Sequence, residues 1–111
     1  MNNLRIQRLL EMLIEEPNDS FLLYALATEY LKLNDNQKAL FYYLETVNTN
    51  EDYVGVYYHL AKLYEGLKES ENAFETYQKG MKIARKIGDN HAFSELQSAF
   101  NIFNGLDYEN E

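Results

Sequence analysis

The heptapeptide YALATEY, residues 24–30, is followed 34 positions later by YHLAKLY, residues 58–64. Both begin and end with tyrosine, and both have Leu-Ala at their third and fourth places. The same shift pairs identical residues outside the heptapeptides: Leu33 with Leu67, Ala39 with Ala73, and Tyr43 with Tyr77. Self-similarity at one fixed period is typical of repeat architectures, in which each unit buries the apolar face of its neighbour.

Each repeat unit has the apolar spacing of two helices, in which steps of one and three residues alternate. In the first unit these residues are Leu23, Leu26, Ala27 and Tyr30, followed by Ala39, Leu40, Tyr43 and Leu44. The spacing predicts first helices over residues 20–33 and 53–67. Polar connectors, NDNQ and KESE, separate them from the second helices, and Asn36 and Ser70 are the predicted N-caps. Each unit is therefore expected to be an antiparallel helical hairpin.

These residues resemble the tetratricopeptide repeat, a helix-turn-helix unit of 34 residues with the pattern W-x2-L-G-x2-Y, then A-x3-F, then Pro. The matching places hold Leu23 and Tyr57, Leu26-Ala27 and Leu60-Ala61, Tyr30 and Tyr64, Ala39 and Ala73, and Tyr43 and Tyr77. The chain departs from the pattern in two ways. Asn34 and Lys68 replace the glycine between the helices, and neither full unit ends in proline. The chain looks like the small free-standing bacterial members of this family.

The resemblance implies an all-α fold, a right-handed α-α superhelix of about six antiparallel helices. We expect one domain over residues 1–111. Its predicted parts are an N-terminal helix at 1–16, repeats at 17–51 and 52–87, a C-terminal capping helix at 88–104 and a tail at 105–111. Ile6, Leu9, Leu10 and Leu13 form the apolar stripe of the leading helix; Ala92, Phe93, Leu96, Ala99, Phe100 and Phe103 form that of the capping helix. Gly88 and Asp89 are expected to end one helix and cap the next. The family pattern fails in the last helix, where Glu95 and Ser98 stand in the places of Ala and Tyr.

Composition narrows the classes of partner. The chain has 18 acidic and 10 basic residues, a net charge of −8, so it would repel the phosphate backbone of a nucleic acid. It has no cysteine, and its first residues lack the long apolar run of a signal peptide or membrane span. We expect a soluble, cytoplasmic protein that binds neither nucleic acid nor membrane. A basic cluster, Lys79, Lys82, Arg85 and Lys86, is attributed to the favourable position of cations near a helix C-terminus, with docking of an acidic partner as the alternative.

The sequence offers little for catalysis. It lacks phosphate-binding glycine loops and the common nucleophile and zinc motifs, and His59 and His91 are its only histidines. We predict no catalytic residue, no metal site and no cofactor. An enzyme using His59 with Glu65 or Glu29 is a remote alternative.

We predict a protein-interaction module that binds a protein or peptide partner. In the family it resembles, first helices line a concave groove, and helical spacing assigns Tyr24, Thr28, Tyr58, His59 and Lys62 to that surface. Tyr24 and Thr28 stand where some members have the Lys and Asn that grip a C-terminal carboxylate, so this clamp is not expected. Packing within the fold is the alternative role for Tyr24 and Tyr58. The alternative function is a self-associating, homodimeric helical protein that uses the aromatic residues at 41–43, which cannot all face the core.

Overall fold

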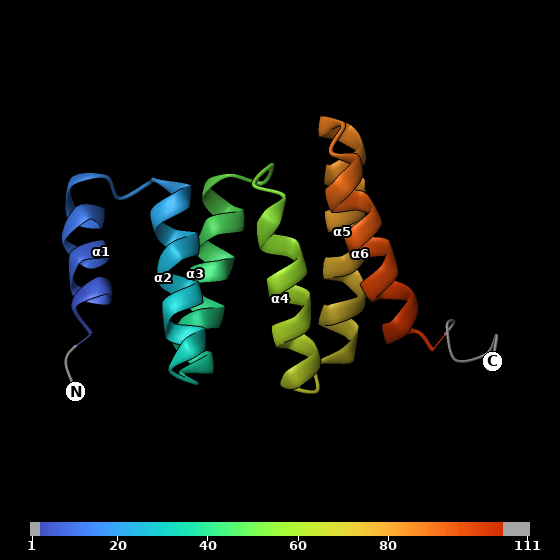
Figure 1. Cartoon of the computed structure of the whole chain (residues 1–111), viewed down its shortest axis with the longest axis horizontal. Coiled ribbons are helices and arrows are strands. Elements are labelled where there is room, and N and C mark those ends of the chain that lie inside the picture. Colours follow the sequence, from blue (N-terminus) through green and yellow to red (C-terminus); the bar gives the residue numbers. More distant parts are fainter. Residues whose placement is uncertain (1–2, 106–111) are drawn as a thin grey trace. The chain divides into compact units, whose positions relative to one another are not determined.

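The structure is a computed structural model that describes residues 3–105, and these residues form six helices and no strand (Figure 1). The helices are α1 (Leu4–Glu15), α2 (Ser20–Lys32), α3 (Asn36–Thr49), α4 (Gly55–Gly66), α5 (Ser70–Ile87) and α6 (Asn90–Phe103). The all-α prediction of about six helices is confirmed. Beyond Gly105, the predicted tail lies outside the described residues. Within residues 3–105, no helix is both long and apolar enough to cross a membrane.

The chain divides into two compact units, Met1–Val56 and Tyr57–Glu111. In the first unit, α2 packs against both α1 and α3. In the second, α5 packs against α6, and Gly80 of α5 lies directly against Tyr57 of α4.

The core of the first unit combines repeat residues with the apolar stripe of α1. Ala27 of α2 and Ala39 of α3 are fully buried, and small side chains at these places let two helices approach closely. Tyr43, also fully buried, fills the adjacent space. The predicted stripe of α1 is confirmed: Ile6 and Leu9 are buried in a cluster with residues of α2, and Leu10 and Leu13 pack partly buried against it.

The second unit repeats this arrangement, since Ala61, Ala73 and Tyr77 are likewise fully buried. It also has a close approach at Gly80, where the first unit has Thr46. A Cβ atom added to Gly80 would lie 2.6 Å from the Cβ of Tyr57 and 3.0 Å from Cδ1 of Leu96. Only a glycine fits at this point of α5 without movement of its neighbours.

The turns between paired helices have the same backbone geometry in both repeats. Asn34 and Lys68, which stand where the family has glycine, have φ angles of 61° and 62°, in the left-handed region. The following amide donates back to the carbonyl of a helix residue in each case, Asp35 to Tyr30 at 3.0 Å and Glu69 to Tyr64 at 2.9 Å. Both turns therefore adopt a backbone conformation that favours glycine, although neither has a glycine at this place.

Two predicted N-caps are wrong by one residue. Asn36 is the first residue of α3, and the carboxylate of Asp35 caps the helix by accepting the amide of Lys38 at 3.2 Å. Ser70 is the first residue of α5, and Glu69 before it makes no side-chain capping bond. In each turn the left-handed residue, Asn34 or Lys68, is followed by a single residue before the helix begins.

The end of α5 and the start of α6 follow the prediction. Gly88 adopts a left-handed conformation with φ of 77°, and the Asp89 carboxylate accepts the amide of Ala92 at 2.9 Å. α5 has 18 residues and α3 has 14. The helix after α5 therefore begins later in the sequence than a fixed repeat length predicts. Alignment on the N-caps Asp19 and Asp89 pairs Leu26 with Leu96 and Tyr30 with Phe100. Most of the first-helix pattern thus reappears two residues later than a fixed period predicts, although Gln97 replaces the small Ala27.

Candidate functional site

A pocket of about 240 Å³ lies between α4 and α6 in the second unit. Tyr58 and Lys62 line it from α4, because residues four positions apart share one face of a helix. The α6 side is formed by residues at helical spacing: Glu95, Ser98, Ala99 and Ile102. Tyr58 is half-buried and Lys62 is exposed, so both present atoms to the pocket and to solvent.

The α6 residues of this pocket were not predicted as site residues. In the sequence, Glu95 and Ser98 differ from the repeat pattern but carry no site prediction. Their spacing with Ile102, three and four residues apart, is the signal that could have identified them as one face of α6.

A hydrogen bond holds Glu65, three residues after Lys62 on α4. The hydroxyl of Tyr77 donates to Oε2 of Glu65, and Nζ of Lys62 lies 3.9 Å from Oε1. Burial and the hydrogen bond to this carboxylate raise the pKa of Tyr77 well above its usual value. Tyr77 therefore remains a neutral donor, and it orients a negative charge next to Lys62.

His59 is half-buried beside Tyr58, and the two rings meet edge to face with centroids 5.5 Å apart. Burial lowers the pKa of His59, and the negative charge of Glu95 opposes part of this effect. The imidazole is therefore mostly neutral at pH 7.

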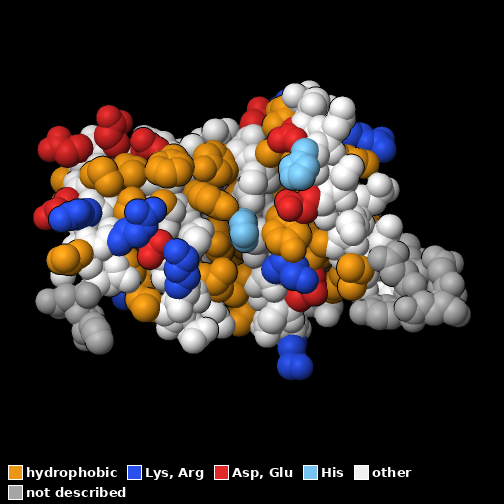
Figure 2. All heavy atoms as spheres, in the orientation of Figure 1, with side chains coloured by type: hydrophobic (Ala, Val, Ile, Leu, Met, Phe, Trp, Pro, Cys, Tyr) orange, Lys and Arg blue, Asp and Glu red, His pale blue; other side chains and the backbone are white. Residues whose placement is uncertain are grey.

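The carboxylates considered as partners of His59 have other partners. Glu65 accepts from Tyr77, as described above. Glu29, in the first unit, accepts from Nε of Arg5 at 2.9 Å and from Nζ of Lys32 at 3.2 Å. Figure 2 shows such acidic and basic side chains side by side over α1 and α2, beside a band of hydrophobic side chains. Across residues 3–105, no three acidic or histidine side chains converge in a group that could hold a metal ion.

Tyr24 and Thr28 lie together in the first unit and take part in its packing. The ring of Tyr24 is 6.0 Å from that of Tyr43 and 5.2 Å from that of Tyr53, measured between centroids. Thr28 Oγ1 donates to the Tyr24 carbonyl and lies 3.1 Å from the Tyr43 hydroxyl, which is placed to donate to it. The structure therefore groups the predicted site residues within their units, Tyr24 with Thr28 and Tyr58 with His59 and Lys62. Their role in partner binding stays a prediction.

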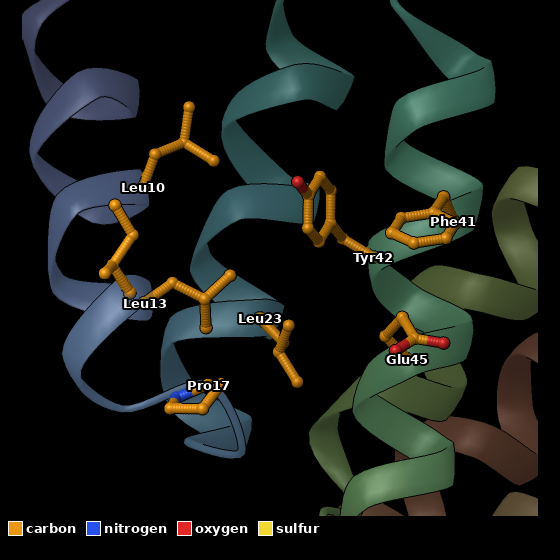
Figure 3. A pocket seen from close by; sticks show the side chains of 8 residues that line it. Leu10, Leu13, Pro17, Leu23, Phe41, Tyr42 and Glu45 are labelled. Carbon is orange, nitrogen blue, oxygen red and sulfur yellow. The ribbon is translucent and has the colours of Figure 1, made fainter.

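A second, more apolar pocket of about 450 Å³ lies in the first unit (Figure 3). It is lined by Leu10, Leu13, Ile14, Pro17, Leu23, Phe41, Tyr42 and Glu45. Figure 3 shows Leu10 and Leu13 pointing from α1 toward α3, and Tyr42 pointing back, with Leu23 of α2 between them. Tyr43 is buried, Tyr42 is half-buried and Phe41 is 56% exposed, which confirms that the aromatic residues at 41–43 do not all face the core.

Comparison with known proteins agrees with this architecture. The family model described as tetratricopeptide repeat matches residues 22–53 and 54–87. A solution structure of a tetratricopeptide repeat domain protein from Salinibacter ruber is 47% identical, with a TM-score of 0.76, covering 81% of this chain and 91% of that chain. No curated protein matches the chain significantly.

Two more distant structures share the fold alone. One is a Bordetella parapertussis protein, 20% identical with a TM-score of 0.78, covering 98% of this chain and 96% of that one. The other is the TPR2B domain of yeast Sti1 in a complex with pHsp70. It is 17% identical with a TM-score of 0.83, covering 91% of this chain and 81% of that one. From the matched repeats and the Salinibacter relative, this chain belongs to the tetratricopeptide repeat family.

Proposed function

We propose that this protein is a non-catalytic interaction module that binds a protein or peptide partner at the pocket between α4 and α6. The tetratricopeptide fold commonly mediates protein–protein interaction, and its domains are generally non-catalytic. The observation that carries the proposal is that Tyr58 and Lys62, two predicted binding residues, line one pocket with α6.

The pocket has the mixed chemistry of a peptide-recognition surface. The phenol of Tyr58 combines an apolar ring with a hydrogen-bonding hydroxyl, a pairing enriched at interfaces. Lys62 and Glu95 supply opposite charges, and Ile102, 46% exposed, supplies apolar surface. These groups suit a segment that inserts one apolar side chain and places a carboxylate near Lys62.

Tyr24 and Thr28 occupy the equivalent places of the first repeat, and we propose them as partner contacts within the first unit. They precede Tyr58 and Lys62 by 34 residues. Both residues contact Tyr43, so a Tyr24 variant changes core packing as well as any partner binding. A Tyr58 variant is therefore the better test of binding.

Affinity capture from the native cell, with Tyr58→Ala as the matched variant, tests the proposal. Loss of a buried interface tyrosine commonly costs about 2 kcal/mol, or roughly 30-fold in affinity. We expect the parent to retain a partner that Tyr58→Ala releases, while circular dichroism shows both folded. Glu75→Ala, on the exposed surface of α5, serves as the control and should bind like the parent. Equal binding by Tyr58→Ala would contradict the proposal.

Self-association is the second candidate function, and the apolar pocket of the first unit favours it. Ile14 is 79% exposed beside Phe41, and apolar side chains of this size are often covered in an assembly. Sedimentation at increasing concentration should then show a dimer that Phe41→Glu dissociates. A parent that remains monomeric would exclude this function.

A further inference from the structure

A third pocket, of about 410 Å³, lies between α5 and α6 in the second unit. Its residues combine two cations, two amides and two large apolar side chains: Lys82, Arg85, Gln78, Gln97, Met81 and Phe93. Phe93 and Gln97 are four residues apart and occupy one face of α6. Glu95 and Ser98, which line the Tyr58 pocket, project from the other side of the helix.

The two cations of this pocket have no carboxylate partner within residues 3–105. Arg85 places its guanidinium 4.5 Å from the centroid of the Phe93 ring, and Lys82 makes no ion pair with the described residues. This is notable in a chain with 18 acidic and 10 basic residues, where carboxylates are in surplus. A stacked guanidinium keeps its N–H donors available at the ring edge.

The position of Lys82 argues against a purely helix-stabilising role. Favourable interaction with the helix dipole falls off within the last turn, which in α5 contains Arg85 and Lys86. Lys82 stands more than one turn before the end of the helix at Ile87. The dipole therefore accounts for Arg85 and Lys86 but leaves Lys82 unexplained.

We propose that this pocket binds an acidic segment of a partner protein, one in which an apolar residue lies between carboxylates. Arg85 and Lys82, three residues apart on α5, can each receive a carboxylate. Met81 and Phe93 offer an apolar wall to the side chain between them, and the amides of Gln78 and Gln97 can bond the peptide backbone. A nucleic acid is disfavoured, because the net charge of −8 would repel its extended phosphate backbone.

This site is independent of the proposed partner pocket. It uses the opposite side of α6 and shares no lining residue with the Tyr58 pocket. Failure of one assignment leaves the other intact.

The test is fluorescence anisotropy with labelled peptides and the full chain. The probe is a capped hexapeptide with the order Glu-Glu-Leu-Phe-Glu-Glu, compared with the same peptide carrying Lys for Glu. We expect the acidic peptide to bind, the basic peptide to fail, and binding to weaken as salt rises. Lys82→Gln with Arg85→Gln should weaken binding at least tenfold.

The control is a second double variant with the same change in net charge, Lys79→Gln with Lys86→Gln, on the same helix but outside the pocket lining. It should bind the acidic peptide within about threefold of the parent. Both double variants are checked by thermal melting, so a folding defect is recognised.

Equal loss of peptide binding in the two double variants would show general charge attraction and overturn the site. Amide shifts near Phe93 on peptide addition support it, whereas shifts confined to Tyr58 and Lys62 overturn it. Tighter binding of single-stranded oligothymidine than of the peptide, lost in Lys82→Gln with Arg85→Gln, would also overturn it in favour of a nucleic-acid ligand.

Discussion

Gly80→Ala is the substitution for which the structure gives the sharpest expectation. The added Cβ would lie 2.6 Å from the Cβ of Tyr57, 3.1 Å from its Cγ and 3.0 Å from Cδ1 of Leu96. Leu96 Cδ1 is the end of a flexible side chain and can rotate away. The Tyr57 Cβ is fixed to the backbone, so relief requires α4 and α5 to separate by several tenths of an ångström.

Two opposing effects set the size of the change. Alanine is favoured over glycine in a helix interior by about 0.8–1.0 kcal/mol. Overpacking of a close contact costs about 1–3 kcal/mol. We expect the steric effect to prevail, with a net loss of up to about 2 kcal/mol in the free energy of unfolding. For a domain of this size, that lowers the melting temperature by up to roughly 12 °C.

Gly66→Ala provides the matched control in the same unit. A Cβ at Gly66 meets nothing within 4 Å, and its φ is not in the left-handed region. This variant should be neutral or more stable by up to about 1 kcal/mol. Urea unfolding of both variants and the parent, followed by circular dichroism, measures the difference. Equal stabilisation by both alanines would refute the close packing of α4 against α5.

Three further predictions concern stability. Lys68→Gly should stabilise the fold by about 1 kcal/mol in urea unfolding, because lysine is strained at positive φ, whereas Asn34→Gly should change little since asparagine tolerates this conformation. Burial alone would raise the pKa of Glu29, but the hydrogen bonds of its carboxylate to two cations outweigh burial and lower this pKa. The stabilisation by ionised Glu29 is therefore present above about pH 4.5, and it is lost as the pH falls through the lower pKa of the folded state. Glu29→Gln should therefore cost about 1 kcal/mol at pH 7 and make unfolding free energy less dependent on pH between pH 5 and 3; an unchanged acid profile would contradict the ion-pair assignment. Ala61→Phe should cost about 1–3 kcal/mol by overpacking a fully buried position, while Lys62→Ala, one residue on, should leave the melting temperature nearly unchanged; equal melting of the two would show that the helix faces are misassigned.

The repeat made the fold predictable from sequence. Because the same residues recur after 34 positions, one hairpin constrains the other, and Ala27, Ala61, Tyr43 and Tyr77 are all fully buried as the pattern requires. Local details were less predictable. Asp35, rather than Asn36, caps α3, since either side chain can accept an amide and only the backbone conformation of the preceding turn selects between them.

The candidate site was predicted from one side only. Helical spacing placed Tyr58 and Lys62 on one helix face, and both line the same pocket, while their role in partner binding stays a prediction. The facing residues of α6 were missed because a fixed period ignores the longer α5, which shifts the following helix by two residues. The packing of Tyr24 against Tyr53 depends on a tertiary contact with a connecting segment, which the helical pattern does not specify.

Site-specific photocrosslinking in the native cell tests the central claim most directly. A photoreactive phenylalanine analogue replaces Lys62, an exposed residue lining the pocket between α4 and α6, or Glu75, an exposed residue of α5 outside that pocket. The account predicts one dominant crosslinked protein from position 62, reduced by the additional change Tyr58→Ala, and no crosslink from position 75 that depends on Tyr58. Crosslinking from position 75 alone, with none from position 62, would contradict the assignment of the α4–α6 pocket as the partner-binding surface.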